Sequence, residues 1–170
     1  SKLPFEKNLE QSFKIYELTQ KYNACLEVEL GYVGYNDSSK NKMTSPEEVK
    51  LLTQQLPVTA LAVSVGNTHL QNENSAIIDY DLLAKINNVT NTPLVIHGGS
   101  GINPLDRMKM SKNYGVRKFN IGTEFRKMFG AVLREIFFKN DHIFDRFEIM
   151  KELNFALSAK AKKLLKDTNL

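Results

Sequence analysis

The hydrophobic pattern alternates along the chain between strand-like and helix-like segments. Short apolar runs that end in glycine or a polar residue predict strands, and apolar residues three or four positions apart predict helices. The expected strands cover residues 24–31, 59–66, 93–97 and 116–121. The expected helices cover residues 5–22, 46–56, 80–88, 104–113, 123–139 and 145–167, while the polar residues 32–45 predict an exposed loop.

This alternation predicts the α/β fold class. Strands that alternate with helices form right-handed βαβ units and a parallel sheet. Four strands are few for a doubly wound domain, and a complete (β/α)₈ barrel needs about 250 residues. We therefore expect residues 1–170 to form a single domain that supplies about the last four βα units of a TIM barrel plus a C-terminal helix. The opening at Ser1 favours a fragment.

Composition narrows the classes of function. The chain carries 23 Lys and Arg against 19 Asp and Glu, and the net charge of +4 is spread without a basic tract. This favours an anionic small ligand and argues against a nucleic-acid partner. No apolar stretch approaches the length of a membrane span, so no membrane partner is expected. The single Cys25 cannot form an internal disulfide; we predict a buried, inert thiol and a cytoplasmic protein.

Two of the three histidines follow predicted strands directly. His69 lies in the segment after the 59–66 strand, and His97 ends the next strand. Because neighbouring strands are about 4.8 Å apart, their imidazoles can converge on one metal ion. Glu29, at the end of the preceding strand, can add a carboxylate, and Glu27 is its rival because it faces the same side. His142 lies between two helices and is predicted to be solvent-exposed.

The same strand ends carry a candidate anion site. Gly98, Gly99, Ser100 and Gly101 form a glycine-rich turn before a helix, and such a turn can present backbone N–H groups to phosphate. The last strand continues into Asn120, Ile121, Gly122 and Thr123 at the start of another helix. In TIM barrels the phosphate site commonly comes from the loops after the last two strands.

Five motifs, in the same order, resemble the class II fructose- and tagatose-bisphosphate aldolases. They span nearly the whole chain, which makes the set far more specific than any one motif. They read LPFEKN at residues 3–8, EVELG at 27–31, LAVSVGNTH at 61–69, LVIHGGSG at 94–101 and VRKFNIGTEFR at 116–126.

The resemblance implies a TIM barrel in which His69 and His97 bind a catalytic Zn²⁺ and Glu29 lies near an alternative metal position. It also implies that Gly98, Gly99, Ser100 and the segment from Asn120 through Ile121 and Gly122 to Thr123 bind dihydroxyacetone phosphate. In that family the zinc ion acts as a Lewis acid on the ketone of a ketose bisphosphate while a carbon–carbon bond breaks. The family's catalytic Asp belongs to an upstream segment outside this chain.

Two segments depart from the family pattern. Leu70 follows His69 where the family usually has Gly, and the nearby Lys of the family is missing. The loop after Gly31 is shorter and less acidic than the loop that helps proton transfer in the family. Its one acid, Asp37, could substitute there, but a turn-forming role is favoured.

Two functions from different classes remain open. The first is an aldolase portion that works when joined to the missing half of the barrel. The second is a degenerate, catalytically inactive relative that acts as a binding or structural protein. Four barrel strands leave two open edges. Whichever function holds, we therefore expect the chain to form a homo-oligomer or to pair with a partner.

Overall fold

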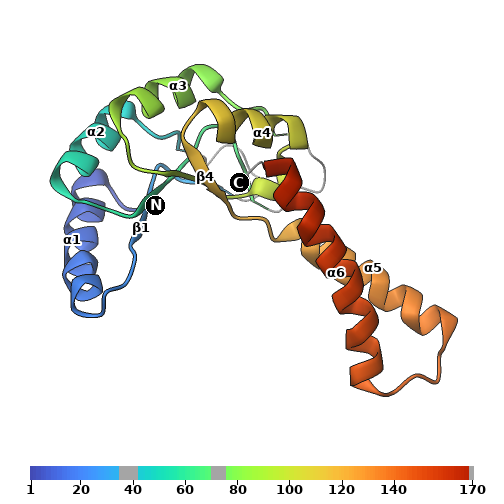
Figure 1. The fold of residues 1–170 in the computed structure, drawn as a ribbon. Helices are drawn as coiled ribbons and strands as arrows, with labels where there is room; N and C mark the ends of the chain where they lie inside the picture. The colour runs from blue at the N-terminus through green and yellow to red at the C-terminus, as the bar shows by residue number, and fades with distance from the viewer. Residues whose placement is uncertain (35–41, 70–75, 169–170) are drawn as a thin grey trace.

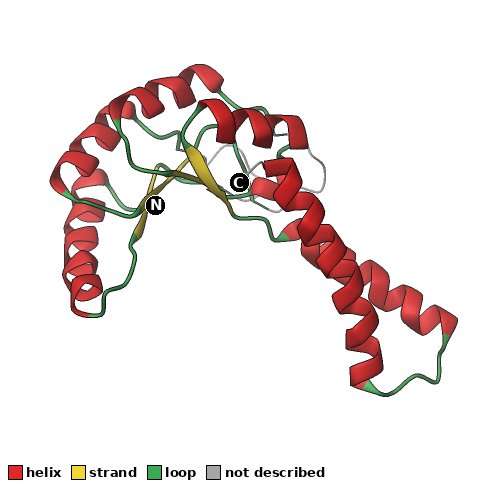
Figure 2. Ribbon diagram, in the orientation of Figure 1, coloured by secondary structure: helices red, strands yellow, loops and turns green. Residues whose placement is uncertain are grey.

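The computed structural model describes residues 1–34, 42–69 and 76–168. Within them, four strands form one parallel sheet in the order β1-β2-β3-β4. Figure 2 draws the strands in yellow and the helices in red. The strands are β1 (Glu27–Leu30), β2 (Ala60–Val63), β3 (Leu94–Ile96) and β4 (Val116–Phe119). Their order along the sheet follows their order along the chain, as in consecutive units of a βα barrel.

Helices connect and follow the strands as the sequence predicts. They are α1 (Phe5–Lys21), α2 (Pro46–Gln55), α3 (Tyr80–Val89), α4 (Pro104–Asn113), α5 (Thr123–Lys139) and α6 (Arg146–Thr168), with a short 3₁₀ turn, η2 (Gly99–Gly101). Figure 1 shows α1 to α4 in an arc beside the sheet, while α5 and α6 project from it as a helical hairpin. None of the described helices is both long and apolar enough to cross a membrane.

The two faces of the sheet differ in chemistry. Val28, Leu30, Leu61 and other strand residues pack in the core cluster with apolar residues of α2, α3 and α4. Glu27 and Glu29 alternate with the buried residues of β1, so they face the opposite side. That inner face therefore carries carboxylates beside small or apolar neighbours.

An ion pair across the inner face shows that the sheet is curved. Lys118 Nζ of β4 lies 2.6 Å from Glu27 Oε2 of β1. In a flat sheet, strands three positions apart would be separated by roughly 14 Å, more than these two side chains could span. The sheet therefore bends toward its inner face, which is the curvature of a barrel wall.

The strands are shorter than predicted, and the prediction for Cys25 was wrong. The structure places Cys25 on the surface, because β1 begins only at Glu27 and residue 25 belongs to the connection that leaves α1. The strand therefore does not extend to Cys25, and the thiol is not buried. His142 is exposed, as predicted, with 94 % of its side chain accessible.

A buried arginine connects the hairpin of α5 and α6 to α4 and to the turn after β3. Arg107 of α4 is 1 % exposed; its guanidinium pairs with the carboxylate of Glu124, and its Nε donates to the Gly99 carbonyl at 3.1 Å. Lys160 of α6 lies 2.5 Å from the other oxygen of Glu124. Burial raises the pKa of Glu124, but the hydrogen bonds from Lys160 and Arg107 outweigh it and the net pKa falls below the ordinary value of 4.5.

We predict that Glu124→Gln destabilises the chain by about 3 kcal/mol at neutral pH, because it leaves the buried Arg107 charge unpaired. Since the folded pKa of Glu124 lies below 4.5, its stabilising effect is present above that pH and is lost as the pH falls through the folded value. Urea unfolding at a series of pH values should show that the difference in free energy of unfolding between wild type and variant decreases in acid. Glu135→Gln, which breaks the exposed pair with Lys139, is the control and should leave the free energy of unfolding nearly unchanged, because exposed ion pairs contribute little. A difference in free energy of unfolding that does not change with pH would contradict the stabilising role of ionised Glu124.

Candidate functional site

The carboxyl ends of the four strands bring the predicted site residues to one edge of the sheet. His69 follows β2, His97 follows β3, and Asn120 follows β4. The ring centroids of His69 and His97 are 6.1 Å apart, and the ring planes are inclined by 42°. The two imidazoles therefore meet at the edge, as the sequence predicts.

A close backbone contact holds the two histidine segments together. Gly98 has a φ of +64°, and a Cβ at this position would lie 2.2 Å from the carbonyl oxygen of Thr68. Only glycine fits this combination of left-handed backbone and close approach. The turn after β3 therefore lies directly against the chain just before His69.

The side chain of Asn67 adds a second link between these strand ends. Asn67 is fully buried; its Oδ1 accepts from the Val65 N–H at 2.8 Å, and its Nδ2 donates to the His97 carbonyl at 2.9 Å. A buried amide satisfied in this way fixes the turns on which it acts. The relative position of the two histidines is thus set by backbone and amide contacts rather than by the imidazoles themselves.

Both candidate carboxylates of β1 lie near His97. Glu27 Oε1 is 3.0 Å from His97 Nε2, and Glu29 Oε2 is 3.8 Å from His97 Nδ1. Burial raises the pKa of Glu27, but hydrogen bonds from Lys118 and His97 lower it below 4.5, so Glu27 is ionised at neutral pH. Burial and the neighbouring His97 lower the pKa of His69, which favours its neutral, metal-binding form.

The donor set suits zinc chemically but is incomplete. Two imidazoles bound to one tetrahedral zinc ion would have centroids roughly 5 Å apart, so the 6.1 Å spacing requires a closure of about 1 Å. Within the described ranges, no group of three or more His, Cys, Asp or Glu side chains has the spacing of a metal site. These residues therefore fit as part of a zinc site, since catalytic zinc takes three protein ligands.

A pocket of about 720 Å³ opens beside His69. Six of the seven predicted substrate-binding residues line it: Gly98, Ser100, Asn120, Ile121, Gly122 and Thr123. The seventh, Gly99, is buried, and its N–H donates to the Asn120 carbonyl at 3.0 Å. Gly99 thus joins the two halves of the pocket wall.

The first turn of α5 points its N–H groups toward this pocket. Gly122 precedes the helix, and the Glu124 N–H donates to Ser100 Oγ at 3.2 Å. The N-terminus of a 17-residue helix carries a partial positive charge that attracts anions. The pocket therefore combines polar groups with a favourable field for phosphate.

The sequence reasoning missed Arg126 as a site residue. Arg126 lines the pocket, and its Nη2 lies 3.2 Å from Thr123 Oγ1. The sequence contained a signal for this residue. The helix from residue 123 was predicted, and residues three apart on a helix share a face, so Arg126 is expected beside Thr123. Leu70 and Asp37, at which the sequence departs from the family pattern, lie outside the described residues.

Comparisons with known proteins agree with this arrangement. Fructose-bisphosphate aldolase of Mycoplasma genitalium is 33 % identical over 162 residues, covering 89 % of this chain and 56 % of that protein. Fructose-bisphosphate aldolase of Mycoplasma pneumoniae is 37 % identical over 139 residues, covering 79 % of this chain and 48 % of that protein. The chain therefore spans about half the length of the curated relatives it matches.

Solved structures show the same fold. Fructose-bisphosphate aldolase from Campylobacter jejuni has a TM-score of 0.81 at 23 % identity, covering 99 % of this chain and 58 % of that one. The YdjI aldolase from Escherichia coli K12 has a TM-score of 0.77 at 22 % identity, covering 98 % of this chain and 56 % of that one. The family model described as fructose-bisphosphate aldolase class-II matches residues 1–170. With paired strand-end histidines beside the pocket at the start of α5, and with this match along its whole length, the chain belongs to the class II fructose-bisphosphate aldolase family.

Proposed function

We propose that the protein containing this chain catalyses zinc-dependent aldol cleavage and condensation of a ketose bisphosphate, with dihydroxyacetone phosphate and an aldehyde phosphate as the products of cleavage. The observation that carries the proposal is the meeting of His69 and His97, 6.1 Å between centroids, beside the pocket at the start of α5. The names of the Mycoplasma relatives support the reaction class. A cytoplasmic location suits a chain with one exposed cysteine and no membrane-spanning helix in its described part.

In this proposal His69 and His97 would hold the zinc ion, and Glu29 would lie near an alternative metal position. Glu27 positions His97, because it accepts a hydrogen bond from Nε2 and thereby leaves Nδ1, the nitrogen nearer Glu29, as the metal donor. Bound zinc would supply Lewis-acid polarisation of the substrate ketone. The remaining ligand and the proton-transfer group come from the part of the barrel that lies outside this chain.

The pocket binds the phosphate of the substrate. Ser100 and Thr123 offer hydroxyl groups, Asn120 offers an amide, and Gly98 and Gly122 let the ligand approach the backbone. Gly99 and Ile121 shape the wall on which these groups are held, since a Cβ on Gly99 would lie 3.1 Å from Ile121. Arg126 adds the positive charge that the family elsewhere takes from a lysine.

We predict that the chain binds Zn²⁺ weakly, since it supplies fewer than three strong ligands, and that His69→Ala and His97→Ala abolish this binding. Isothermal titration calorimetry with Zn²⁺ measures the effect directly. His142→Ala is the matched control, because His142 is the remaining histidine and is 94 % exposed. Heats that are unchanged in the His69 and His97 variants would remove both residues from the metal site.

Arg126→Met should weaken binding of dihydroxyacetone phosphate by roughly tenfold, because a charged hydrogen bond to phosphate contributes about 1.5 kcal/mol or more. Affinity can be measured by calorimetry or by ligand-observed NMR. Arg134→Met, which removes another exposed arginine of α5 away from the pocket, provides the control. Equal loss in both variants would mean that net charge, not the position of Arg126, governs binding.

The activity itself is tested by joining this chain to the complementary barrel half of a relative. Fructose 1,6-bisphosphate and tagatose 1,6-bisphosphate are offered separately, and triose phosphate release is followed with a coupled dehydrogenase. We expect cleavage of at least one substrate, its loss with a chelator, its recovery with Zn²⁺, and a decrease of about a thousandfold or more in His97→Ala. Zinc and phosphate binding without turnover would instead support a degenerate relative that only binds its ligand.

A further inference from the structure

A break in the strand register turns Lys118 toward the inner face of the sheet. Leu94 of β3 pairs with Val116 of β4. The next residue, Val95, pairs with Lys118 instead of Arg117, which is therefore an extra residue in β4. Val116 is buried in the core cluster, and in a regular strand a residue two positions later would face the same core. The β-bulge reverses this direction, and bulges commonly redirect a side chain next to an active site.

Small side chains leave room for Lys118 to reach across the inner face. Ala60 and Ala62 of β2 pair with Glu27 and Glu29 of β1. The residues that alternate with these alanines belong to the core cluster on the other side, so the alanines face inward. Because each alanine presents only a methyl group, the lysine can reach the far strand, and its Nζ lies 2.6 Å from Glu27 Oε2.

Two carboxylates compete for the single N–H of neutral His97. Glu27 Oε1 lies 3.0 Å from Nε2, and Glu29 Oε2 lies 3.8 Å from Nδ1. A neutral imidazole carries its proton on one nitrogen, and the hydrogen bond made by that nitrogen decides which one remains free. Since Glu27 is within hydrogen-bond distance and Glu29 is not, this geometry places the proton on Nε2 and leaves Nδ1 free.

We propose that Lys118 is a positioning residue for His97 and that it acts through Glu27. Its ammonium group holds Glu27 Oε2, which directs Oε1 to Nε2 and keeps the proton away from the nitrogen nearer Glu29. A metal-binding histidine needs an unprotonated nitrogen in a fixed direction, and loss of such a supporting partner typically lowers metal affinity by about 10- to 100-fold. In its consequence for zinc this inference rests on the proposed function, whereas its effect on His97 does not.

The ion pair of Lys118 and Glu27 orients side chains and contributes little to folding. The lysine side chain is 54 % exposed and the glutamate side chain is 27 % exposed. Because ion pairs this accessible add little to stability, Lys118→Met is expected to remain folded. The variant therefore removes the contact that directs Glu27 without removing any part of the core.

The test determines the tautomer of His97 by long-range ¹H–¹⁵N NMR of the 170-residue chain, above the pH range in which histidine titrates. The chain has three histidines, so the spectra of His69→Ala and His142→Ala assign the signals. We expect the Nε2–H form in wild type. In Lys118→Met the two ring-nitrogen signals of His97 should shift toward a mixture that contains the Nδ1–H form, because Glu29 then competes for the proton.

Two further variants separate positioning from a general loss of charge. Lys118→Arg keeps a cationic donor for Glu27 and should restore the wild-type pattern of His97. Lys139→Met, which breaks the exposed pair with Glu135, should leave that pattern unchanged. An unchanged His97 pattern in Lys118→Met, or the same change in Lys139→Met, would overturn the proposal.

Zinc affinity gives a second measurement, made by competition with a chelator on this chain joined to the complementary barrel half of a relative. Lys118→Met should weaken zinc binding by roughly tenfold. Adding Lys118→Met to Glu27→Gln should cause no further loss, because the lysine acts through the glutamate. Losses that add in the double variant would overturn the proposal. A joined barrel that binds no zinc, with the tautomer shift in Lys118→Met still present, would refute the proposed function and still support the positioning of His97.

Discussion

The contact between the turn after β3 and the end of the β2 segment governs the arrangement of the whole site. Parallel strands necessarily end at the same edge, but that alone leaves their loops free to diverge. Here the left-handed Gly98 lies against Thr68, and the buried Asn67 bonds to the His97 carbonyl. Because these two backbone segments are held together in this way, the imidazoles of His69 and His97 lie 6.1 Å apart, and the pocket wall of Gly98 and Ser100 is fixed beside them.

The inner face of the sheet imposes the second constraint. Glu27 bonds to both Lys118 and His97, so one carboxylate joins β1, β3 and β4 across the concave side. Ionised groups on a sheet face need charged partners or water, and a curved sheet lets long side chains from distant strands provide them. The same curvature directs the strand-end groups toward a common centre, which is how a barrel wall concentrates chemistry at its carboxyl rim.

Much of the fold and of the candidate site could be predicted from the sequence, because the local hydrophobic pattern and the order of the motifs determine them. Helices such as the one beginning at Pro104 have capping and proline signals, and the two strand-end histidines follow apolar runs. The sequence favoured Glu29 but left Glu27 as its rival, because residues two apart in a strand share a face; in the structure both carboxylates lie near His97, Glu27 3.0 Å from Nε2 and Glu29 3.8 Å from Nδ1. The pairing of Glu27 with Lys118, 91 residues away, and the surface position of Cys25 depend on tertiary contacts and on where the strand begins.

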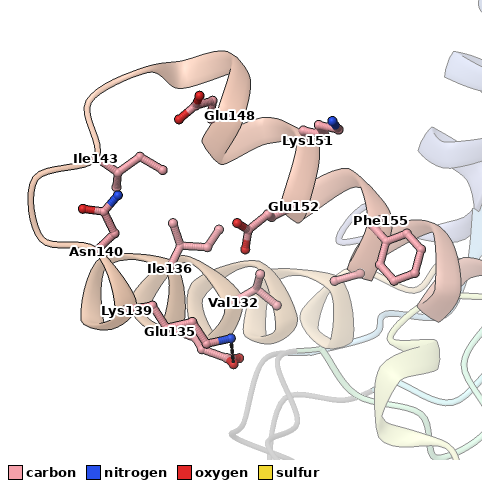
Figure 3. A pocket seen from close by; sticks show the side chains of 11 residues that line it. Val132, Glu135, Ile136, Lys139, Asn140, Ile143, Glu148, Lys151, Glu152 and Phe155 are labelled. Atoms are coloured by element: carbon pink, nitrogen blue, oxygen red, sulfur yellow. Dashed lines mark ion pairs between the residues drawn. The ribbon is translucent and has the colours of Figure 1, made fainter.

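Helix α5 runs from the pocket beside His69 to the outer end of the hairpin. Its first turn forms part of the pocket through Thr123 and Arg126, and its outer half lines a groove between α5 and α6 through Val132 and Ile136 (Figure 3). A helix of 17 residues is about 25 Å long, so contacts at its far end do not reach the pocket directly. Glu124 links the pocket to the hairpin, because it pairs with Arg107 beneath the glycine turn and with Lys160 on α6. The position of the hairpin and the position of the pocket beside His69 are therefore set by the same three charged side chains, of which Arg107 is buried.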